Sequence, residues 1–424
     1  MIGFLLKGVL RDRTRSLFPF LVVFAGVIIT VLIHAWMGGA RSHIISANAN
    51  FNTGHVKVMS RAYAKHESQI PNDLAYIGVQ QLVNELKTDF PDMIWTPRIR
   101  FGGLLDIPDE NGETRTQSPI FGLAVDLFGE QSPERDILNL RQAVVRGRLP
   151  EKAGEILISN QLAQKLGVHL NEQATLMSST MYGALCMYNF TVTGTLDFGV
   201  AAMDRGAVIA DITDIQVALD MQDASGEILG FFNNYRYQDL KAIEHCREFN
   251  QKYERTNDKF APIMFSLAEQ KALAEILDLY DYMGSIIVGI FVFIMSIVLW
   301  NAGLMGNIRR YGEIGVRLAI GESSAHLYRS LVYESILIGF FGSLAGTLVG
   351  LGIAYYLQEV GIDISAWLQK STVLITNIVG ARITPVTFYI GFVPGFMATI
   401  LGTAISGLSI YKRQTAQLFR ELEV

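Results

Sequence analysis

The sequence has few charged residues and few cysteines, and each of these shortages excludes some classes of protein or site. Only 18% of its 424 residues are charged while 50% are hydrophobic, a balance that indicates a membrane protein. The formal charge of −5 is spread along the chain without a long basic tract, which argues against nucleic acid as a partner. The two cysteines, Cys186 and Cys246, lack the C-x-x-C spacing of zinc and dithiol sites. They could form one disulfide in an oxidising compartment or remain two buried thiols.

Motifs for nucleotide binding and hydrolysis are also missing. No Gly-Lys is followed by Ser or Thr, so there is no phosphate loop, and Gly312, Gly315 and Gly321 lack the spacing of a phosphate cradle. There is no G-x-S-x-G or H-E-x-x-H, and the seven histidines are scattered. His34 could be a proton site, although an interfacial histidine that hydrogen-bonds a neighbour is the commoner case. We therefore predict a chain that is not an enzyme and holds no cofactor or metal.

The chain does contain four long apolar stretches. Each exceeds the roughly 20 residues that cross a bilayer, and together they predict transmembrane helices over residues 17–38, 283–305, 327–357 and 385–411. The first stretch follows several arginines, as a cleaved signal peptide would, but its apolar core is longer than the roughly 7 to 15 residues of a signal sequence. We therefore predict four retained spans.

Basic residues assign the sides of the membrane. Lysines and arginines gather before the first span, between the second and third, and after the fourth, which predicts that these segments are cytoplasmic. They are an amphipathic elbow over 1–16, a coupling loop over 306–326 and a tail over 412–424. Residues 39–282 and the short segment 358–384 then lie outside. The predicted fold is an α-helical membrane protein with four transmembrane helices plus a large α/β extracytoplasmic domain between helices 1 and 2.

The predicted outer domain alternates short strands and helices. GHVKVMS, IFGLAVDL, GEILIS, FTVTGTLD and GAVIAD have the pattern of strands, and NQLAQKLG and DLKAIEHCREFNQKY have the pattern of helices. About 240 residues are enough for one or two folded domains. From Ser266 the sequence keeps helical spacing without a breaker up to the second span. We therefore expect one long helix that joins the domain to that span.

Two kinds of surface are predicted within the spans. The third span repeats glycine on one helical face, which allows close backbone approach, and we expect it to pack within the subunit against the neighbouring fourth span. These glycines are Gly339, Gly342, Gly346 and Gly350. The first two spans carry bulky side chains, which either face lipid or accept acyl chains. The candidates for such a substrate cavity are Phe24, Ile28, Leu32, Ile287, Phe291 and Met295.

The cytoplasmic loop between the second and third spans contains GEIGVRLAIGES, residues 312–323. Glu313 and Arg317 have the i, i+4 spacing that supports one helical turn. Gly321 suits the end of such a turn, and Ser323 or Ser324 suits the start of the next helix. The loop therefore predicts a short charged helix between two spans.

This loop and the following span resemble the core of FtsX-like ABC transporter permeases. The residues on that family's pattern are Asn301, Glu313, Ile314, Gly315, Arg317, Ala319, Ile320, Gly321, Ser323, Glu334, Gly339, Gly342 and Gly346. Gly312 and Glu322 depart from it. GRLPEKAGEILISNQLAQKLGVHL also resembles the family's outer domain. The size of the chain, the absence of a fused ATPase and the FNTGHVKV segment are most similar to lipoprotein-releasing permeases of the LolC/LolE type, and the topology is similar to that of MacB-type proteins.

The resemblance implies a permease subunit in the bacterial inner membrane, with both termini cytoplasmic. It implies these partners: two cytoplasmic ABC ATPase subunits that bind ATP and Mg, a second permease copy or paralogue, membrane lipid, and a periplasmic lipoprotein carrier or other periplasmic protein. The residues implied in ATPase coupling are Arg309, Arg310, Glu313, Arg317 and Glu322. The expected function is extraction of lipoprotein or another amphiphile. The alternatives are a signalling module that activates a periplasmic partner such as a cell-wall hydrolase, and export of an antibiotic or peptide with a periplasmic adaptor.

Overall fold

The computed structural model describes residues 13–129, 132–199, 201–309, 316–363 and 378–407. It divides into two compact units. The helical unit comprises Met1–Ser42, Asp278–Ile362 and Val379–Val424. The α/β unit comprises His43–Leu277 and Asp363–Ile378.

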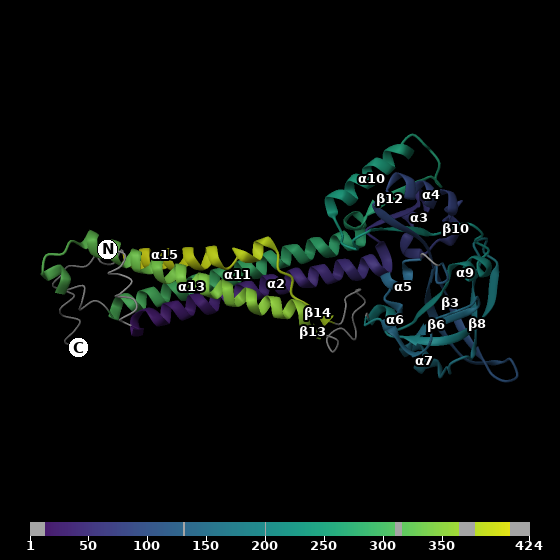
Figure 1. The fold of residues 1–424 in the computed structure, drawn as a ribbon, viewed down its shortest axis with the longest axis horizontal. Coiled ribbons are helices and arrows are strands. Elements are labelled where there is room, and N and C mark those ends of the chain that lie inside the picture. Colours follow the sequence, from purple (N-terminus) through teal and green to yellow (C-terminus); the bar gives the residue numbers. More distant parts are fainter. Residues whose placement is uncertain (1–12, 130–131, 200, 310–315, 364–377, 408–424) are drawn as a thin grey trace. The chain divides into compact units, whose positions relative to one another are not determined.

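Four long helices build the helical unit (Figure 1). They are α2 (Arg13–Asn48), α11 (Lys271–Arg309), α13 (Ser324–Val360) and α15 (Phe392–Gly407). The turn η5 (Pro385–Phe388) precedes α15, and β13 (Ile362–Asp363) pairs with β14 (Ile378–Val379). Within the described residues, the stretches long and apolar enough to cross a membrane are Leu17–Thr53, Leu273–Val298, Ser324–Val360 and Pro385–Ile405. The chain therefore has the helices of a multi-pass membrane protein.

The helix ends differ from the predicted spans because a helix need not stop where a bilayer would. α2 continues past residue 38 to Asn48, and α11 begins before residue 283. The expectation that this helix begins at Ser266 is wrong. Ser266 pairs with Val56 in the sheet, and its backbone and side chain both hydrogen-bond Glu269 in a capping box. A 3-10 turn, η4 (Leu267–Glu269), therefore comes first. Residues 1–12 of the predicted elbow and the predicted tail lie outside the described residues.

A ten-stranded sheet forms the centre of the described α/β unit. Its strands run in the order β12-β1-β11-β3-β4-β9-β6-β8-β5, with β7 paired to β3 and β8. In chain order they are β1 (Val56–Ser60), β3 (Met93–Pro108), β4 (Thr114–Val125), β5 (Val144–Gly147), β6 (Glu155–Ser159), β7 (Gln173–Ser179), β8 (Leu185–Leu196), β9 (Ala207–Asp211), β11 (Glu227–Phe232) and β12 (Pro262–Ser266). The pairs β4/β9 and β6/β8 are parallel, and the other pairs are antiparallel. A separate short pair joins β2 (Tyr76–Ile77) to β10 (Ala224–Ser225).

Short helices connect these strands. The larger ones are α4 (Val79–Asp89), α7 (Asn160–Leu166), α9 (Ile212–Ala218) and α10 (Asp239–Tyr253). Others are the π-helix η1 (Ala49–Thr53), α3 (Arg61–Lys65), η2 (Glu67–Gln69), η3 (Asn72–Leu74), α5 (Glu134–Ile137), α6 (Leu140–Ala143) and α8 (Ala201–Asp204). Every strand and helix predicted for this domain is present. α7 shows why: the Ser159 hydroxyl accepts from Leu162 N at its start, and Gly167 ends it with a φ of 63°.

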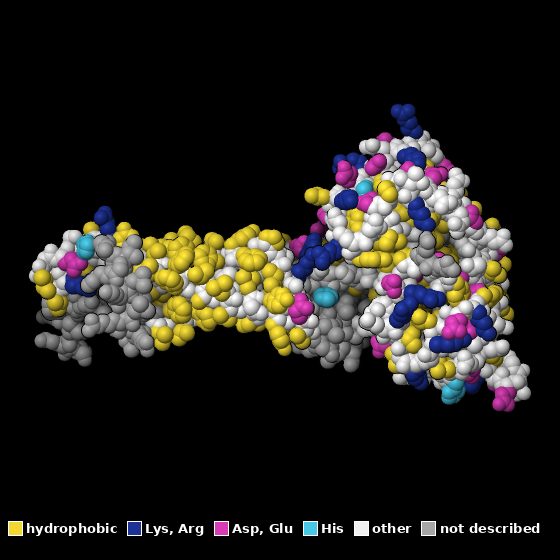
Figure 2. Space-filling model, viewed as in Figure 1, with side chains coloured by type: hydrophobic (Ala, Val, Ile, Leu, Met, Phe, Trp, Pro, Cys, Tyr) yellow, Lys and Arg dark blue, Asp and Glu magenta, His cyan; other side chains and the backbone are white. Residues whose placement is uncertain are grey.

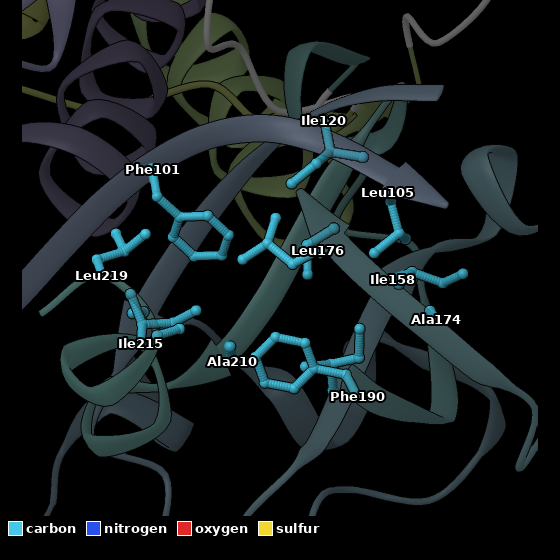
Figure 3. Close-up of a cluster of buried hydrophobic side chains, with 14 of the residues drawn as sticks. Phe101, Leu105, Ile120, Ile158, Ala174, Leu176, Phe190, Ala210, Ile215 and Leu219 are labelled. Atoms are coloured by element: carbon cyan, nitrogen blue, oxygen red, sulfur yellow. The ribbon is translucent and has the colours of Figure 1, made fainter. Parts of the chain in front are cut away.

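Two separate cores stabilise the α/β unit. The larger one contains Phe101, Leu176 and Phe190 among apolar side chains of several strands (Figure 3). The second lies under α4 and α10 and includes Trp95. Cys186 belongs to the first core and Cys246 to the second, and both are free and buried. The structure therefore has two buried thiols in place of a disulfide, and burial raises the pKa of each.

Candidate functional site

The glycines of α13 bring it into close contact with α2. A methyl group placed on Gly346 would lie 2.8 Å from the Phe24 carbonyl oxygen, and one on Gly350 would lie 3.0 Å from Val31 Cβ. Gly342 approaches Val23 in the same way, at 3.2 Å. These glycines pack within one chain, as expected, but these three meet the first span. The third and fourth spans are also neighbours, as expected, since a methyl group on Gly395 would lie 3.0 Å from Ser343 Oγ. Of the four predicted glycines only Gly339 faces α15, where its methyl group would lie 3.1 Å from Thr399 Cβ.

The buried face of α2 is a row of valines. Val23, Val27 and Val31 have no exposed surface, and their spacing of four residues places them on one side of the helix. α15 also meets this row, since a methyl group on Gly395 would lie 2.6 Å from Val27 Cγ2. The sequence correctly predicted that the glycines allow close packing of helices. It did not indicate that a row of valines on another helix packs against them.

Hydrogen bonds inside the bundle come from small polar side chains. The hydroxyl of Thr399 donates to Gly395 O at 2.6 Å, and that of Thr30 donates to Gly26 O at 2.8 Å. His34 Nδ1 lies 3.1 Å from Thr387 Oγ1, which is the commoner role of an interfacial histidine. No group of three metal-binding side chains is found among the described residues.

α11 presents an open apolar face. In the most apolar stretch of α11, none of the described residues is buried. In the most apolar stretch of α13, 39% of the residues are buried. The exposed side chains recur with the i, i+3, i+4, i+7 spacing of one broad helical face. They are Met283, Ile286, Ile287, Ile290, Phe293, Ile294, Ile297 and Val298. Such a face in a membrane helix is available to lipid, to another subunit or to an apolar ligand.

Some of the residues predicted to line a cavity have exposed side chains, and others pack against neighbouring helices. Ile287 lies on the open face of α11 and is 42% exposed. Phe24, Ile28 and Phe291 are half-buried, and Leu32 packs against the cluster of Ala35, Ala354 and Ala381. Nothing is described of the Met295 side chain. Leu32 therefore does not belong to the open surface, because its side of α2 packs against the bundle.

Sequence reasoning missed most of the open surface. On α11 it selected Ile287, Phe291 and Met295 as cavity candidates but not Ile290, which is 55% exposed. On α2 the exposed apolar side chains include Leu21 and Ile29. The helical spacing in the sequence could have shown that such residues share a face. It could not have shown which face the rest of the chain leaves uncovered.

The structure describes the predicted coupling loop at residues 306–309, which end α11, and again from Val316 onward. Residues 316–319 are helical, Gly321 follows with a φ of 99°, and the Ser323 hydroxyl caps α13 by accepting from His326 N. The predicted helix end and the predicted start of the next helix are thus confirmed. Arg310 and Glu313 lie outside the described residues, and Arg309 is the last residue of α11.

The described part of this loop also exposes apolar side chains. Val316 is 49% exposed and Ile320 is 81% exposed, and their i, i+4 spacing places them on one side of the turn. Glu322 lies 3.7 Å from His326, measured from Oε1 to Nε2. An exposed isoleucine beside charged residues is a surface suited to a protein partner.

In the α/β unit, a buried ion pair lies beside η1, the π-helix that follows α2. Arg98 on β3 donates from Nε and Nη2 to the two oxygens of Glu134, both at 2.8 Å. The side chains are 1% and 0% exposed. Arg98 Nη1 also donates to the carbonyl oxygen of Asn50, in η1, at 2.6 Å. The pair therefore holds the segment that follows α2 against the sheet.

A second group of charges joins the strands β1, β11 and β3 to η2, and its members Lys57 and Glu227 are buried. Lys57 Nζ lies 2.7 Å from Glu67 and 3.5 Å from Glu227, and Arg100 pairs with the same two carboxylates. Burial alone would raise the pKa of Glu67, but Lys57 and Arg100 outweigh it, and the net shift is downward. Arg100 Nη1 also donates to Asn52 in η1 at 3.0 Å. Sequence reasoning missed both groups because their members are far apart along the chain.

The chain enters and leaves the α/β unit through neighbouring strands. β1, which follows α2, pairs antiparallel with β12, which precedes α11. Leu267 N donates to His55 O at 3.0 Å, and Gln270 Nε2 donates to Thr53 O at 3.4 Å. The two connections to the membrane helices therefore share one hydrogen-bonded strand pair.

The described helices fit a multi-pass membrane protein, and comparison with known proteins identifies one domain of the chain. Residues 285–415 match the FtsX-like permease C-terminal family. These residues therefore form an FtsX-like permease domain, which confirms the family resemblance inferred from the sequence.

Its relatives include permease proteins of several transport systems. The lipoprotein-releasing system transmembrane protein LolC of Haemophilus influenzae is 23% identical over 277 residues, which are 64% of this chain and 65% of that protein. The macrolide export ATP-binding/permease protein MacB of Wolinella succinogenes is 22% identical over 379 residues, 85% of this chain and 54% of that protein. The chain thus spans less than two thirds of either relative. Among solved structures, the periplasmic region of MacB from Actinobacillus actinomycetemcomitans is 10% identical, with a TM-score of 0.36, over 54% of this chain and 95% of that one.

Proposed function

We propose that this chain is the permease subunit of an ABC transporter in the bacterial inner membrane. Two separate cytoplasmic ATPase subunits bind and hydrolyse ATP with Mg. The α/β unit lies outside the membrane and changes position during the ATPase cycle. Both termini and the loop at 306–326 face the cytoplasm, and the chain itself holds no cofactor. The FtsX-like domain over residues 285–415 supports this role.

The observation that carries the proposal is the pairing of β1 with β12. Since these strands continue toward α2 and α11, a displacement of one helix relative to the other acts directly on two neighbouring strands. The buried pair of Arg98 and Glu134 ties η1 to the same sheet. A flexible linker would absorb such a displacement, whereas a hydrogen-bonded pair passes it into the whole sheet.

The proposed substrate is a lipoprotein or another amphiphile. Each buried methylene of an acyl chain is worth about 0.8 kcal/mol, so a chain that leaves the bilayer needs an apolar surface to shelter it. The open face of α11, with Ile287, Ile290 and Phe293, supplies such a surface, and a second permease copy or paralogue would complete it. A carrier or other periplasmic protein would then receive the substrate.

Export of a small amphiphile is the second candidate function. Relatives of this chain include proteins named for macrolide and pyoverdine export, and the same open face of α11 would serve a smaller apolar ligand. A periplasmic adaptor would replace the lipoprotein carrier in that case.

The coupling role is tested by changing the loop. We expect the double variant Glu313→Ala with Arg317→Ala to fold but to lose ATP-dependent release in vesicles that contain the chain and its ATPase. The matched control is Glu254→Ala with Arg255→Ala, which removes one acidic and one basic side chain from an exposed part of the α/β unit. Unchanged release in the loop variant would refute the coupling role. Single changes at Arg309, Arg310 and Glu322 would then map the contact.

The substrate surface is tested by photo-crosslinking. A crosslinker at Ile290, Phe291 or Phe24 should label the lipoprotein, whereas one at Val393, an exposed residue of α15, should label only phospholipid. If all four positions label phospholipid alone while release continues, the open face of α11 is simply a lipid-facing surface. Labelling by a small amphiphile but not by lipoprotein would favour the second candidate.

A further inference from the structure

Two arginines lie together at one end of the helical unit. Arg41 is on α2, and Arg382 is in the segment that precedes η5. Arg382 N donates to Ala35 O at 2.8 Å, and Arg382 Nη1 donates to the hydroxyl of Ser42 at 2.7 Å. The backbones are also in contact here, because a methyl group on Gly39 would lie 1.7 Å from the Gly380 carbonyl oxygen. Arg382 is therefore held against the turn of α2 that carries Arg41.

Both guanidinium groups keep donors for another ligand. Arg41 uses Nε to donate to the two oxygens of Asp281, at 2.9 and 3.2 Å, and its side chain is 42% exposed. Its terminal nitrogens make no hydrogen bond within the described residues. Arg382 makes no ion pair in that part of the chain either, since its one side-chain hydrogen bond there is to Ser42. The acidic residues described near this end include Asp281, which already faces Arg41, the exposed Asp278 and Glu359, and Asp363 in β13.

The same end of the bundle has the composition of a membrane–water interface. Exposed aromatic side chains gather around the two arginines, and tryptophan and tyrosine concentrate at the level of lipid headgroups. They are Trp36, Tyr282, Tyr355, Tyr356 and Tyr389, between 41% and 68% exposed. Figure 2 shows the apolar surface of the helices giving way to a group of dark blue and magenta side chains at this end. A phosphate at this level would belong to a lipid whose acyl chains lie along the helices.

We propose that Arg41 and Arg382 bind the phosphate of an anionic phospholipid. A guanidinium offers paired, planar donors that match phosphate oxygens better than an ammonium does. Trp36 precedes Arg41 on α2, and Tyr282 directly follows Asp281 on α11. The lipid bridges α2 and the segment at residue 382, and it competes with Asp281 for Arg41. This lipid site does not depend on the proposed transport function.

The test measures which lipid stays bound. The full chain is placed in nanodiscs with equal amounts of phosphatidylglycerol and phosphatidylcholine that have the same acyl chains, and native mass spectrometry counts the retained lipids. We expect retention to favour phosphatidylglycerol, and we expect Arg41→Gln with Arg382→Gln to reduce that preference about tenfold. Lys87→Gln removes an exposed positive charge from α4 and should leave the preference unchanged. An unchanged preference in the double variant, or an equal loss in the control, would overturn the proposal.

Two further measurements separate binding from folding and a lipid from a free ion. Ser42→Ala removes the hydrogen bond to Arg382 but keeps both charges, so it should lower the thermal unfolding midpoint as much as Arg382→Gln does while keeping the lipid preference. If Ser42→Ala abolishes the preference equally, the arginines act through packing alone. Inorganic phosphate at millimolar concentration should not displace the bound lipid. Displacement would identify a site for free phosphate, contrary to the proposal.

Discussion

The two units of this protein treat buried polar groups in opposite ways. Among the described residues, the α/β unit buries charged side chains in number: Lys57, Arg98, Asp106, Glu134, Glu155, Asp204, Asp211, Asp214 and Glu227. The described helical unit buries only hydroxyls: Thr30, Ser335, Ser343, Thr347, Thr387 and Thr399. One unit is stabilised across distant strands by paired charges, and the other by the close approach of helices.

The difference follows from what each unit can offer a polar group. A sheet with long connections can bring an opposite charge to a buried one, as it does for Arg98 and Glu134. A membrane helix has few such partners, and an unpaired charge in hydrocarbon is costly. Hydroxyls avoid this cost, because Thr30, Ser335 and Thr399 donate to backbone carbonyls of their own helices. We therefore expect single changes to disturb the two units in different ways.

The largest effect is expected at Glu134 in the α/β unit. Glu134→Ala leaves Arg98 buried without its carboxylate, which should lower the free energy of unfolding by about 3 to 5 kcal/mol. Unfolding in denaturant, monitored by hydrogen exchange of the β3 amides, measures this change in free energy. In contrast, Glu85→Ala breaks an ion pair with Lys252 whose side chains are 38% and 49% exposed, and it should cost less than about 1 kcal/mol. Equal effects of the two variants would contradict this view of the buried pair.

The replacement of both partners sharpens the same point. Arg98→Met with Glu134→Leu removes the buried charge along with its partner, so most of the stability lost in Glu134→Ala should return. If the double variant is as unstable as the single one, the hydrogen bond from Arg98 to Asn50 is the essential contact. Denaturant unfolding of the three proteins under one condition decides this.

The next effect depends on pH and comes from His55. Its Nδ1 accepts a hydrogen bond from Phe232 N at 3.0 Å, and burial lowers its pKa to about 4. The unfolded chain, with a histidine pKa of about 6.5, binds the proton first as the pH falls. The stability is therefore complete above about pH 6.5 and falls by about 3 kcal/mol as the pH drops toward 4.

The control for this prediction keeps the acceptor but removes the titration. His55→Asn places a carbonyl oxygen near the position of Nδ1, so the bond from Phe232 can persist. Unfolding between pH 7 and pH 4.5 should then show a shallower loss of stability than in the wild type. An identical pH dependence in both proteins would mean that another group accounts for the loss.

The smallest effect is expected in the helical unit. Gly346→Ala places a methyl group 2.8 Å from Phe24 O and 2.9 Å from Val27 Cβ, so the helices must separate, at a cost of about 1 to 3 kcal/mol. Gly352→Ala adds the same methyl group to the same helix with nothing within 4 Å, and it should change stability little. Unfolding in mixed micelles with increasing SDS compares the two. Similar behaviour of both variants would show that the glycine contacts do not stabilise the bundle.

Much of the local structure could be predicted from the sequence because local residues determine it. The pattern of NQLAQKLG gives α7, with Ser159 and Gly167 at its ends. Gly321 and Ser323 mark the end of one helix and the start of the next in the same way. Ser266 was misjudged because its pairing with Val56 depends on a strand about 200 residues earlier. A local helical pattern cannot predict pairing with a strand so distant in the sequence.

The sequence by itself determined the membrane class, the apolar helices, the strands of the α/β unit and the FtsX-like domain. Each of these depends on composition or on spacing within a short window. Only the tertiary structure decided that the glycines of α13 meet the valines of α2, that Arg98 is neutralised by Glu134, and that α11 keeps an open face. Those outcomes depend on which surfaces meet. The apolar faces of different helices have similar compositions, so the sequence does not show which faces pack against each other. Only the folded chain shows which of them remain uncovered.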